Sequence, residues 1–198
     1  MKIPITIYLE ESKKHSPEVE EFVVSSLKRW YNCGPIPLPH SVLVAKHGAE
    51  IVGTVALSFS QGNEIFSLEK IYKFDYNNMP LPFVRDNIVQ FSRWVTGQQN
   101  VSQALLFTSA LIGIKRGCEY GLGEVKPKIR DRFAEIGIDL YFIPADICPE
   151  NIPLAIKPYY LIPPPPLPCM TDLRQEVECL KDLISSTIAE GNLIINFP

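Results

Sequence analysis

Alternating strand-like and helix-like segments fill residues 88–143, and this alternation constrains the fold more than any other feature of the chain. Gly117 and Gly137 follow the two helix-like segments, as residues that end helices do. Strands alternating with helices of this length predict a crossover-connected central sheet with mostly parallel strands. The segments are a strand at 88–95, a helix at 102–116, a strand at 122–125, a helix at 127–136 and a strand at 139–143.

The N-terminal part predicts further elements around the same sheet. Ser16 and Pro17 are typical of a helix start, and the apolar residues that follow, up to Trp30, fall on one helical face. His47-Gly48-Ala49 predicts the turn of a hairpin. The expected strands are at 3–9, 41–46, 50–59 and, less regular in pattern, 65–74.

Composition limits the class of protein. With 198 residues, 46% hydrophobic and 21% charged, the chain is expected to fold as one soluble domain with a tail. A net charge of −3 and no basic stripe argue against nucleic acid as the main partner. No apolar run approaches the roughly 20 residues of a membrane span, and no signal peptide is evident, so a cytoplasmic protein is expected. Five widely spaced cysteines without a C-x-x-C pair indicate neither a zinc site nor a redox motif, and no metal is expected.

Proline-rich sequence separates this region from the C-terminus. The four prolines at 163–166 predict polyproline II, and residues 154–162 are expected to supply one more strand. A final amphipathic helix is expected to begin at Thr171 and to end at Gly191, before an apolar tail at 193–197. We therefore divide the chain into a domain at 1–168 and a helix with its tail at 169–198. The tail can add a strand to another chain, which would make a homodimer.

Two motifs carry a resemblance to a known family. The hairpin with Ile51-Val52-Gly53-Thr54, and the order of the elements over residues 3–165, resemble the acyl-CoA N-acyltransferase (GNAT) fold. Residues 90–95 (QFSRWV) resemble the fourth-strand motif Glu-(Leu/Ile)-Ser-Arg of acyl-homoserine-lactone synthases and long-chain N-acyl amino acid synthases. The resemblance implies an α/β protein with a central mixed sheet flanked by helices. It also implies acyl transfer from a CoA or acyl-carrier-protein thioester to a small amine.

The chain departs from that family at two places. Ordinary acetyltransferases carry (Gln/Arg)-x-x-Gly-x-(Gly/Ala) after the fourth strand, whereas residues 96–103 read TGQQNVSQ. The backbone N–H groups of Gln98 and Gln99 are therefore the candidates to meet the phosphates of the donor. The acyl-homoserine-lactone branch departs from this loop as well, which favours transfer of acyl chains over acetylation. The family's carboxylate near the acceptor amine is replaced by Gln90, which cannot take a proton.

Arg93 is the first candidate catalytic residue. Its guanidinium is expected beside the thioester or the carboxylate of the acceptor, because arginine matches a carboxylate in a bidentate manner. The alternative is a structural ion pair with a glutamate at 69, 119 or 124. Strand alternation puts Arg93 on the face of Phe91, and a bulge would change that face.

Further candidates follow from the expected neighbours of that strand. Glu69 is the expected proton acceptor, in a strand beside residues 90–95, and the alternative is a solvated glutamate. Tyr159, with Tyr160, lies where the resembling fold has a tyrosine that protonates the leaving thiolate. The expected cofactor contacts are Ser92, Trp94, Val95, Gln98, Gln99, Lys128 and Arg130.

Each of these contacts has a structural alternative. Trp94, with Trp30 and Tyr31, either lines an acyl-chain pocket or packs in the core. Lys128 and Arg130 either meet the phosphates of CoA or an acidic carrier protein, or belong to a solvated helix face. The leading hypothesis is an N-acyltransferase. The alternative is a catalytically inactive GNAT-fold protein that binds a ligand or a partner.

Overall fold

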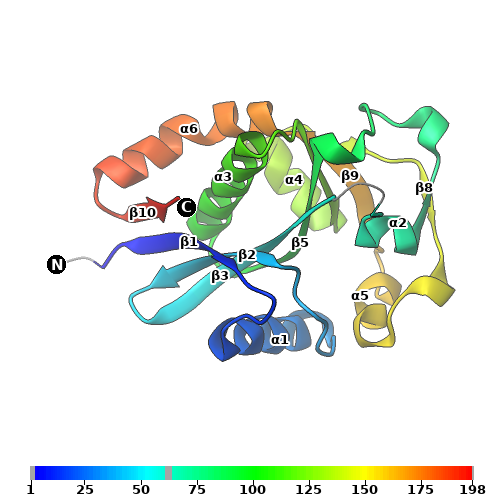
Figure 1. Cartoon of the computed structure of the whole chain (residues 1–198), viewed down its shortest axis with the longest axis horizontal. Helices are drawn as coiled ribbons and strands as arrows, with labels where there is room; N and C mark the ends of the chain where they lie inside the picture. Colours follow the sequence, from blue (N-terminus) through cyan, green and yellow to red (C-terminus); the bar gives the residue numbers. More distant parts are fainter. Residues whose placement is uncertain (1–2, 61–63, 198) are drawn as a thin grey trace.

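Strands from both ends of the chain combine in one curved, mixed sheet, as Figure 1 shows. The computed structural model describes residues 3–60 and 64–197. Within them, the strand order is β10 (Leu193–Asn196), β1 (Ile5–Glu11), β2 (Ser41–His47), β3 (Glu50–Phe59), β5 (Ile88–Thr96), β6 (Tyr120–Val125), β9 (Leu167–Asp172) and β7 (Tyr141–Phe142).

The sheet is mixed, as the resemblance implied, and the expectation of mostly parallel strands was wrong. In the described residues only β1 with β10 and β5 with β6 run parallel. The crossover from β5 through α3 (Gln99–Lys115) to β6 gives the parallel pair that the alternation predicted. After α4 (Pro127–Glu135), however, β7 pairs antiparallel with β9, not with β6.

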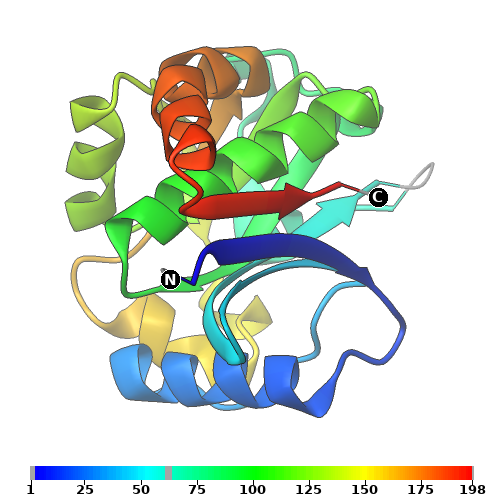
Figure 2. The same ribbon diagram turned by 90° about the vertical axis from the view of Figure 1, so that its left-hand side faces the viewer.

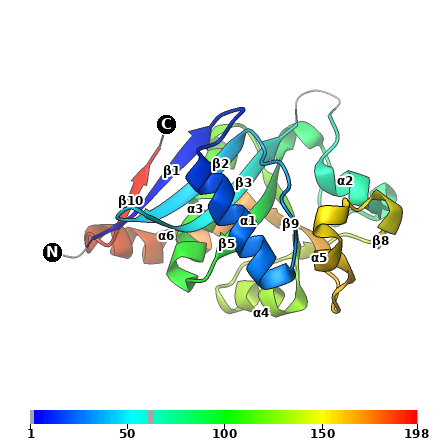
Figure 3. The same cartoon turned by 90° about the horizontal axis from the view of Figure 1, so that it is seen from below.

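Helices cover both faces of the sheet. Figure 2 shows α3 and α6 (Leu173–Ala189) on one face and α1 (Pro17–Tyr31) on the other. Figure 3 shows α1 lying across the underside of the sheet, with α2 (Ser67–Ile71) and α5 (Lys157–Leu161) beyond its end. A separate apolar cluster joins α2 and α5 to the strand residues Ile88, Leu122 and Met170. This second cluster lies beside the β5–β6 pair.

The predicted helix and hairpin of the N-terminal part are confirmed. Pro17 opens α1, and Asn32 closes it in the left-handed conformation with φ 54°. Within the hairpin, Gly53 faces α3. A Cβ at Gly53 would lie 2.8 Å from Val101 Cγ1, so only glycine lets α3 pack this closely on β3. The packing of α3 on β3 therefore explains the glycine of the Ile-Val-Gly-Thr motif.

The expected strand at 65–74 is wrong over most of its length. Its first part forms α2, whose opening turn closes because Glu69 Oε2 accepts a hydrogen bond from the Phe66 N–H at 2.8 Å. Only β4 (Tyr72–Phe74) is extended, and it pairs with β8 (Ala145–Ile147) in a separate two-stranded sheet. β5 has β3 on one side and β6 on the other, so residues 65–74 are not its neighbour in the sheet.

The C-terminal part differs from the prediction in a similar way. Residues 154–162 form a 3₁₀ turn (Leu154–Ile156) and α5, not a strand. The final helix begins at Leu173 and not at Thr171. Thr171 is still part of β9, where it pairs with Gly121 of β6. Asp172 caps α6: its Oδ1 accepts hydrogen bonds from the Arg174 and Gln175 N–H groups at 2.8 and 3.2 Å.

The apolar tail is a strand of the chain's own sheet. β10 pairs parallel with β1 from Ile5↔Leu193 to Tyr8↔Asn196, and Figure 2 shows the two strands side by side. Leu193 is only 2% exposed. β9, which spans the boundary expected at residue 168, and β10 thus both belong to the eight-stranded sheet.

Candidate active site at the split between two strands

β5 and β6 separate after a short paired stretch. Their ladder holds three residue pairs, Ile88↔Tyr120, Val89↔Gly121 and Gln90↔Leu122. Beyond them β5 runs on to Thr96 along β3, and β6 runs on to Val125 along β9. In the described residues, the facing edges of β5 and β6 past Gln90 therefore have no strand partner. We call the split between these two edges the slot, and its walls carry backbone N–H and C=O groups.

A bulge in β5 sets the direction of Arg93. Opposite β3, Thr54 pairs with Val95 and Ala56 with Ser92, so Arg93 and Trp94 together face one residue of β3. Arg93 has φ 50°, in the left-handed region that non-glycine residues rarely adopt. Trp94 turns toward α4, where its ring lies 6.0 Å from that of Phe133.

Arg93 consequently lies on the face of the sheet opposite Phe91. Its Nη2 donates a long hydrogen bond of 3.5 Å to the Pro37 carbonyl, in the loop after α1. Its Nε is buried without a hydrogen-bond partner in the described part of the chain. Burial lowers the pKa of Arg93, and the nearby Tyr160 and Glu124 oppose that shift. No ion pair to the three glutamates considered from the sequence occurs among the described residues. The guanidinium thus has unused donors for an anionic ligand.

Glu124, on β6, is the acidic group of the same face. Tyr160 Oη donates to its Oε1 at 2.7 Å, and Tyr72 Oη donates to its Oε2 at 2.9 Å. Burial raises the pKa of Glu124 to about 7, although both tyrosine hydrogen bonds and the charges of Arg93 and Lys126 favour the carboxylate. A carboxyl with this pKa can change its protonation state near neutral pH.

Aromatic rings and one lysine surround that carboxyl. The ring of Tyr159 contacts that of Tyr31 at 4.9 Å and that of Tyr160 at 5.2 Å between centroids. Lys126 Nζ lies 5.0 Å from the Tyr159 ring centroid and donates to the carbonyls of Ile162 and Pro164 at 2.8 and 2.7 Å. Tyr159 is therefore part of this aromatic cluster, but of the two α5 tyrosines it is Tyr160 that donates to Glu124.

The structure gives Gln90 and Glu69 supporting contacts. Gln90 is 1% exposed, and its side-chain amide bonds the first turn of α2. The Glu69 carboxylate accepts from Arg85 Nε at 3.1 and 3.2 Å and from Tyr76 Oη at 2.6 Å. Burial pushes the pKa of Glu69 up, but the hydrogen bonds from Arg85, Tyr76 and Phe66 outweigh burial, and the pKa is lowered. Neither Arg93 nor Glu124 is among its partners.

The expected cofactor contacts lie around the slot and along the helices beside it. Ser92 Oγ is buried without a partner among the described residues, and Val95 is fully buried. The Gln98 N–H donates to Thr96 Oγ1 at 3.2 Å. The first hydrogen bond of α3 runs from the Ser102 N–H to the Gln98 carbonyl, so the N–H groups of residues 99–101 precede the hydrogen-bonded part of the helix. Lys128 and Arg130 are exposed on α4, and Arg130 pairs with Asp131 at 3.1 Å.

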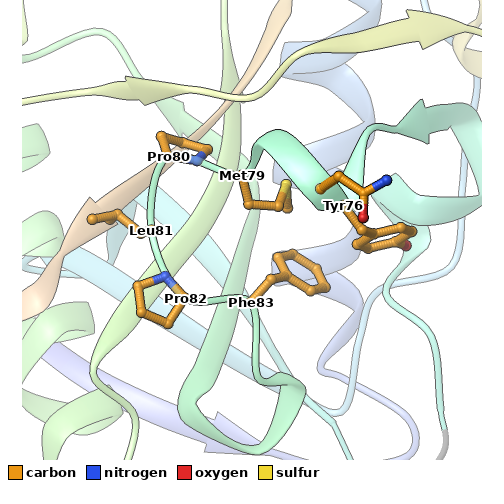
Figure 4. A pocket seen from close by; sticks show the side chains of 7 residues that line it. Tyr76, Met79, Pro80, Leu81, Pro82 and Phe83 are labelled. Atoms are coloured by element: carbon orange, nitrogen blue, oxygen red, sulfur yellow. The ribbon is translucent and has the colours of Figure 1, made fainter.

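A separate hollow of about 460 Å³ lies at the loop before β5, lined by residues 76, 77 and 79–83 (Figure 4). It contains no charged side chain, and the Tyr76 hydroxyl at its wall already donates to Glu69. Within the described ranges, no cluster of three or more acidic, histidine or cysteine residues is arranged to hold a metal ion. None of the described helices has both the length and the apolar character that a membrane crossing requires.

Comparison with solved structures defines the fold. No family model and no curated protein sequence matches the chain. The chain has the GNAT-like fold of the acyl-homoserine lactone synthases. It is similar to the synthase LasI at 9% identity and TM-score 0.61, with 98% of each chain covered.

Two further structures show the same relationship. BjaI, a CoA-dependent acyl-homoserine lactone synthase solved with SAM and isopentyl-CoA, is 14% identical with TM-score 0.61, over 98% of this chain and 94% of BjaI. TofI, in a ternary complex with an inhibitor and MTA, is 12% identical with TM-score 0.60, over 89% of this chain and 96% of TofI. Identities this low establish the shared fold and leave the chemistry to the residues of the slot.

Proposed function

We propose that the protein is an acyltransferase that moves an acyl group from a CoA or acyl-carrier-protein thioester to a small amine. The observation that carries the proposal is the slot between β5 and β6, with unpaired backbone groups on its walls and Arg93 and Glu124 on one face. The solved structures of this fold include a CoA-dependent synthase with isopentyl-CoA, which supports a CoA-linked donor.

In this proposal the slot aligns the thioester for attack. Backbone N–H groups on the unpaired edge of β5 stabilise the oxyanion that forms when the amine attacks the carbonyl carbon. Ser92, Trp94 and Val95 belong to this edge of β5. The N–H group of Gln99, with Lys128 and Arg130, binds the phosphates of the donor, since the Gln98 N–H already bonds Thr96 Oγ1. Arg93 binds a carboxylate, since its half-buried guanidinium has a buried Nε donor without a partner in the described chain. A tyrosine of α5, Tyr159 or Tyr160, lies beside the leaving sulfur.

Thermal unfolding with CoA, acetyl-CoA and a long-chain acyl-CoA tests donor binding. A ligand at about 100 times its Kd stabilises by roughly 2.7 kcal/mol, which raises Tm by about 5–10 °C for a chain of this size. A larger shift with the long-chain donor supports transfer of long acyl chains. Thiol release with a panel of amines, and with acylated carrier protein as a second donor, tests turnover. No release with any pair of substrates contradicts the proposal.

The second candidate is a ligand-binding or interaction protein without turnover. Gln90 favours it, because the resembling synthases have a carboxylate there and a glutamine cannot accept a proton. This candidate expects a Tm shift with acyl-CoA and no thiol release. The two measurements together therefore separate the two functions.

A further inference from the structure

We propose that Glu124 accepts the proton of the attacking amine, in place of the carboxylate that the resembling synthases carry at the position of Gln90. This inference rests on the proposed acyl transfer. It assigns the proton transfer to a residue on the opposite wall of the slot from Gln90.

The register of the two strands supports this position. Gln90 on β5 pairs with Leu122 on β6, and Glu124 lies two residues further along β6. Because side chains alternate along a strand, Leu122 and Glu124 share the face to which Gln90 also points. Arg93 lies on this face as well, and its charge acts on Glu124. A carboxylate lost from one wall of the slot is thus present on the other.

The partners of Gln90 exclude it from proton transfer. Its Oε1 accepts from the Leu68 N–H at 3.2 Å, and its Nε2 donates to Ser67 Oγ at 2.7 Å. Both bonds hold α2 against β5. A glutamine in these bonds has no proton to exchange with a substrate.

The hydrogen bonds of Glu124 suit both of its protonation states. Tyr72 Oη lies 2.9 Å from Glu124 Oε2 and 3.1 Å from the Pro166 carbonyl, but a tyrosine has one hydroxyl proton. The charged carboxylate accepts that proton. The neutral carboxyl instead donates its own proton to Tyr72 Oη, whose hydroxyl then turns to the Pro166 carbonyl. Tyr160 donates to the other carboxyl oxygen in both states. Glu124 can therefore gain and lose a proton when one hydroxyl rotates.

The surrounding groups oppose each other in their effect on Glu124. Burial disfavours the charge on Glu124, and burial together with that charge raises the pKa of Cys169 on β9. Arg93 on β5, Lys126 after β6 and the hydroxyls of Tyr72 and Tyr160 favour it. Burial raises the pKa of Tyr159 on α5 well above the usual value, so it stays neutral. This balance supports the pKa of about 7 and leaves a useful fraction of carboxylate at neutral pH.

The proposed step balances in atoms and charge. The ammonium group of the acceptor gives one proton to the Glu124 carboxylate, and the neutral nitrogen forms a C–N bond with the thioester carbon. The C–S bond breaks, and the second nitrogen proton passes to the leaving sulfur. The products are an amide, a free thiol and neutral Glu124, which releases its proton to solvent.

The test compares pH profiles of kcat/KM for the wild type, Glu124→Gln and Glu119→Gln. Glu119 is an exposed glutamate directly before β6, so it is a matched control. In the wild type and the control we expect kcat/KM to increase with pH around pH 7, and this increase is the rising limb of the profile. Glu124→Gln should lose that limb and about 10²–10⁴-fold in kcat/KM, and should keep its Tm shift with acyl-CoA. Glu124→Asp retains a carboxylate and should keep the limb with reduced activity.

Two results would overturn the assignment. An active wild type with a Glu124→Gln variant that keeps the limb, or loses less than about threefold in kcat/KM, contradicts only the role of Glu124. A wild type that releases no thiol with any donor contradicts the proposed acyl transfer, and the role of Glu124 with it. If Glu124→Gln fails to fold, Glu124→Asp decides: a reduced kcat/KM with the limb kept supports the assignment, and wild-type kcat/KM contradicts it.

Discussion

Gln90 joins the central strand β5 to the short helix α2 through Leu68, whose backbone N–H donates to Gln90 Oε1 at 3.2 Å. The same amide donates to Ser67 Oγ at 2.7 Å, and the residue is 1% exposed. The position at which the resembling synthases have a carboxylate thus has a structural role in this protein. A buried polar group that loses its hydrogen-bond partner lowers the free energy of unfolding, so the contribution of this contact can be measured.

Replacement of Gln90 by methionine should destabilise the fold by about 1–3 kcal/mol, because the Leu68 N–H and the Ser67 hydroxyl lose their partner. Urea unfolding of Gln90→Met and Ser67→Ala measures this. Ser67→Ala should cost less, since it leaves the bond to Leu68 in place. Equal stability of Gln90→Met and the wild type would show that the amide contributes nothing to the fold.

Removal of the tyrosine hydroxyls should move the pH profile upward. The hydrogen bonds from Tyr160 and Tyr72 favour the Glu124 carboxylate, so their loss raises the pKa of Glu124 above about 7. In Tyr160→Phe and Tyr72→Phe we therefore expect the rising limb of kcat/KM at higher pH than in the wild type. Tyr141→Phe, on β7, is the control and should leave the limb in place. A limb that moves to lower pH would contradict the geometry described for this cluster.

Arg93→Asn should reduce acyl transfer without a loss of stability. Asparagine tolerates the left-handed backbone at φ 50°, and the substitution removes a half-buried guanidinium whose Nε has no partner in the described chain. We expect at least about a tenfold loss in kcat/KM, because the anionic ligand loses a charged hydrogen bond of roughly 1.5–3 kcal/mol. Thermal unfolding and thiol release on the same preparation measure both effects. A large drop in Tm with full activity would reverse the assignment.

Glu176, in α6, should make stability depend on pH. It is 0% exposed, and neither carboxyl oxygen makes a well-formed hydrogen bond among the described residues. Burial raises its pKa to about 8, although the nearby Thr171 hydroxyl favours the charge. The folded state therefore holds this proton where the unfolded chain, with a pKa near 4.5, has released it. Stability is full below pH 4.5, falls as pH rises toward 8, and then levels off.

Glu176→Gln should remove this dependence. Relative to the wild type, the variant should gain a few kcal/mol, at most on the order of 4, between pH 5 and pH 9. Urea unfolding at pH 5, 7 and 9 checks the trend, and Glu178→Gln, an exposed site on the same helix, is the control. Parallel curves for Glu176→Gln and the wild type would show that Glu176 is charged or solvated in the folded protein.

Elements with local signals could be predicted from the sequence. Pro17 at the start of α1, the turn at Gly48 and the apolar run of α3 act within one segment, and the structure has each where it was expected. The α2 segment could not be predicted, because its first turn depends on the amide of Gln90, 22 residues away, and on the place of β3 beside β5.

The candidate site, too, could be predicted only in part from the sequence. Arg93 was visible as an outlying charge in an apolar strand, but its bulge depends on the register with β3, and an arginine at positive φ leaves no trace in the sequence. Glu124 was considered only as an ion-pair partner. The period of two from the buried Leu122 was the signal that could have placed its side chain on the inner face. The roles of the predicted site residues remain predictions.

The short ladder between β5 and β6 divides the sheet into two half-sheets. One is built on the hairpin of β2 and β3, and the other on β6 with β9, and packing of α3 on α6 spans the join. Because three residue pairs join the halves, the gap between them can widen or narrow while each half keeps its own hydrogen bonds. A change in the width of that gap therefore leaves the ladders of β5 with β3 and of β6 with β9 in place.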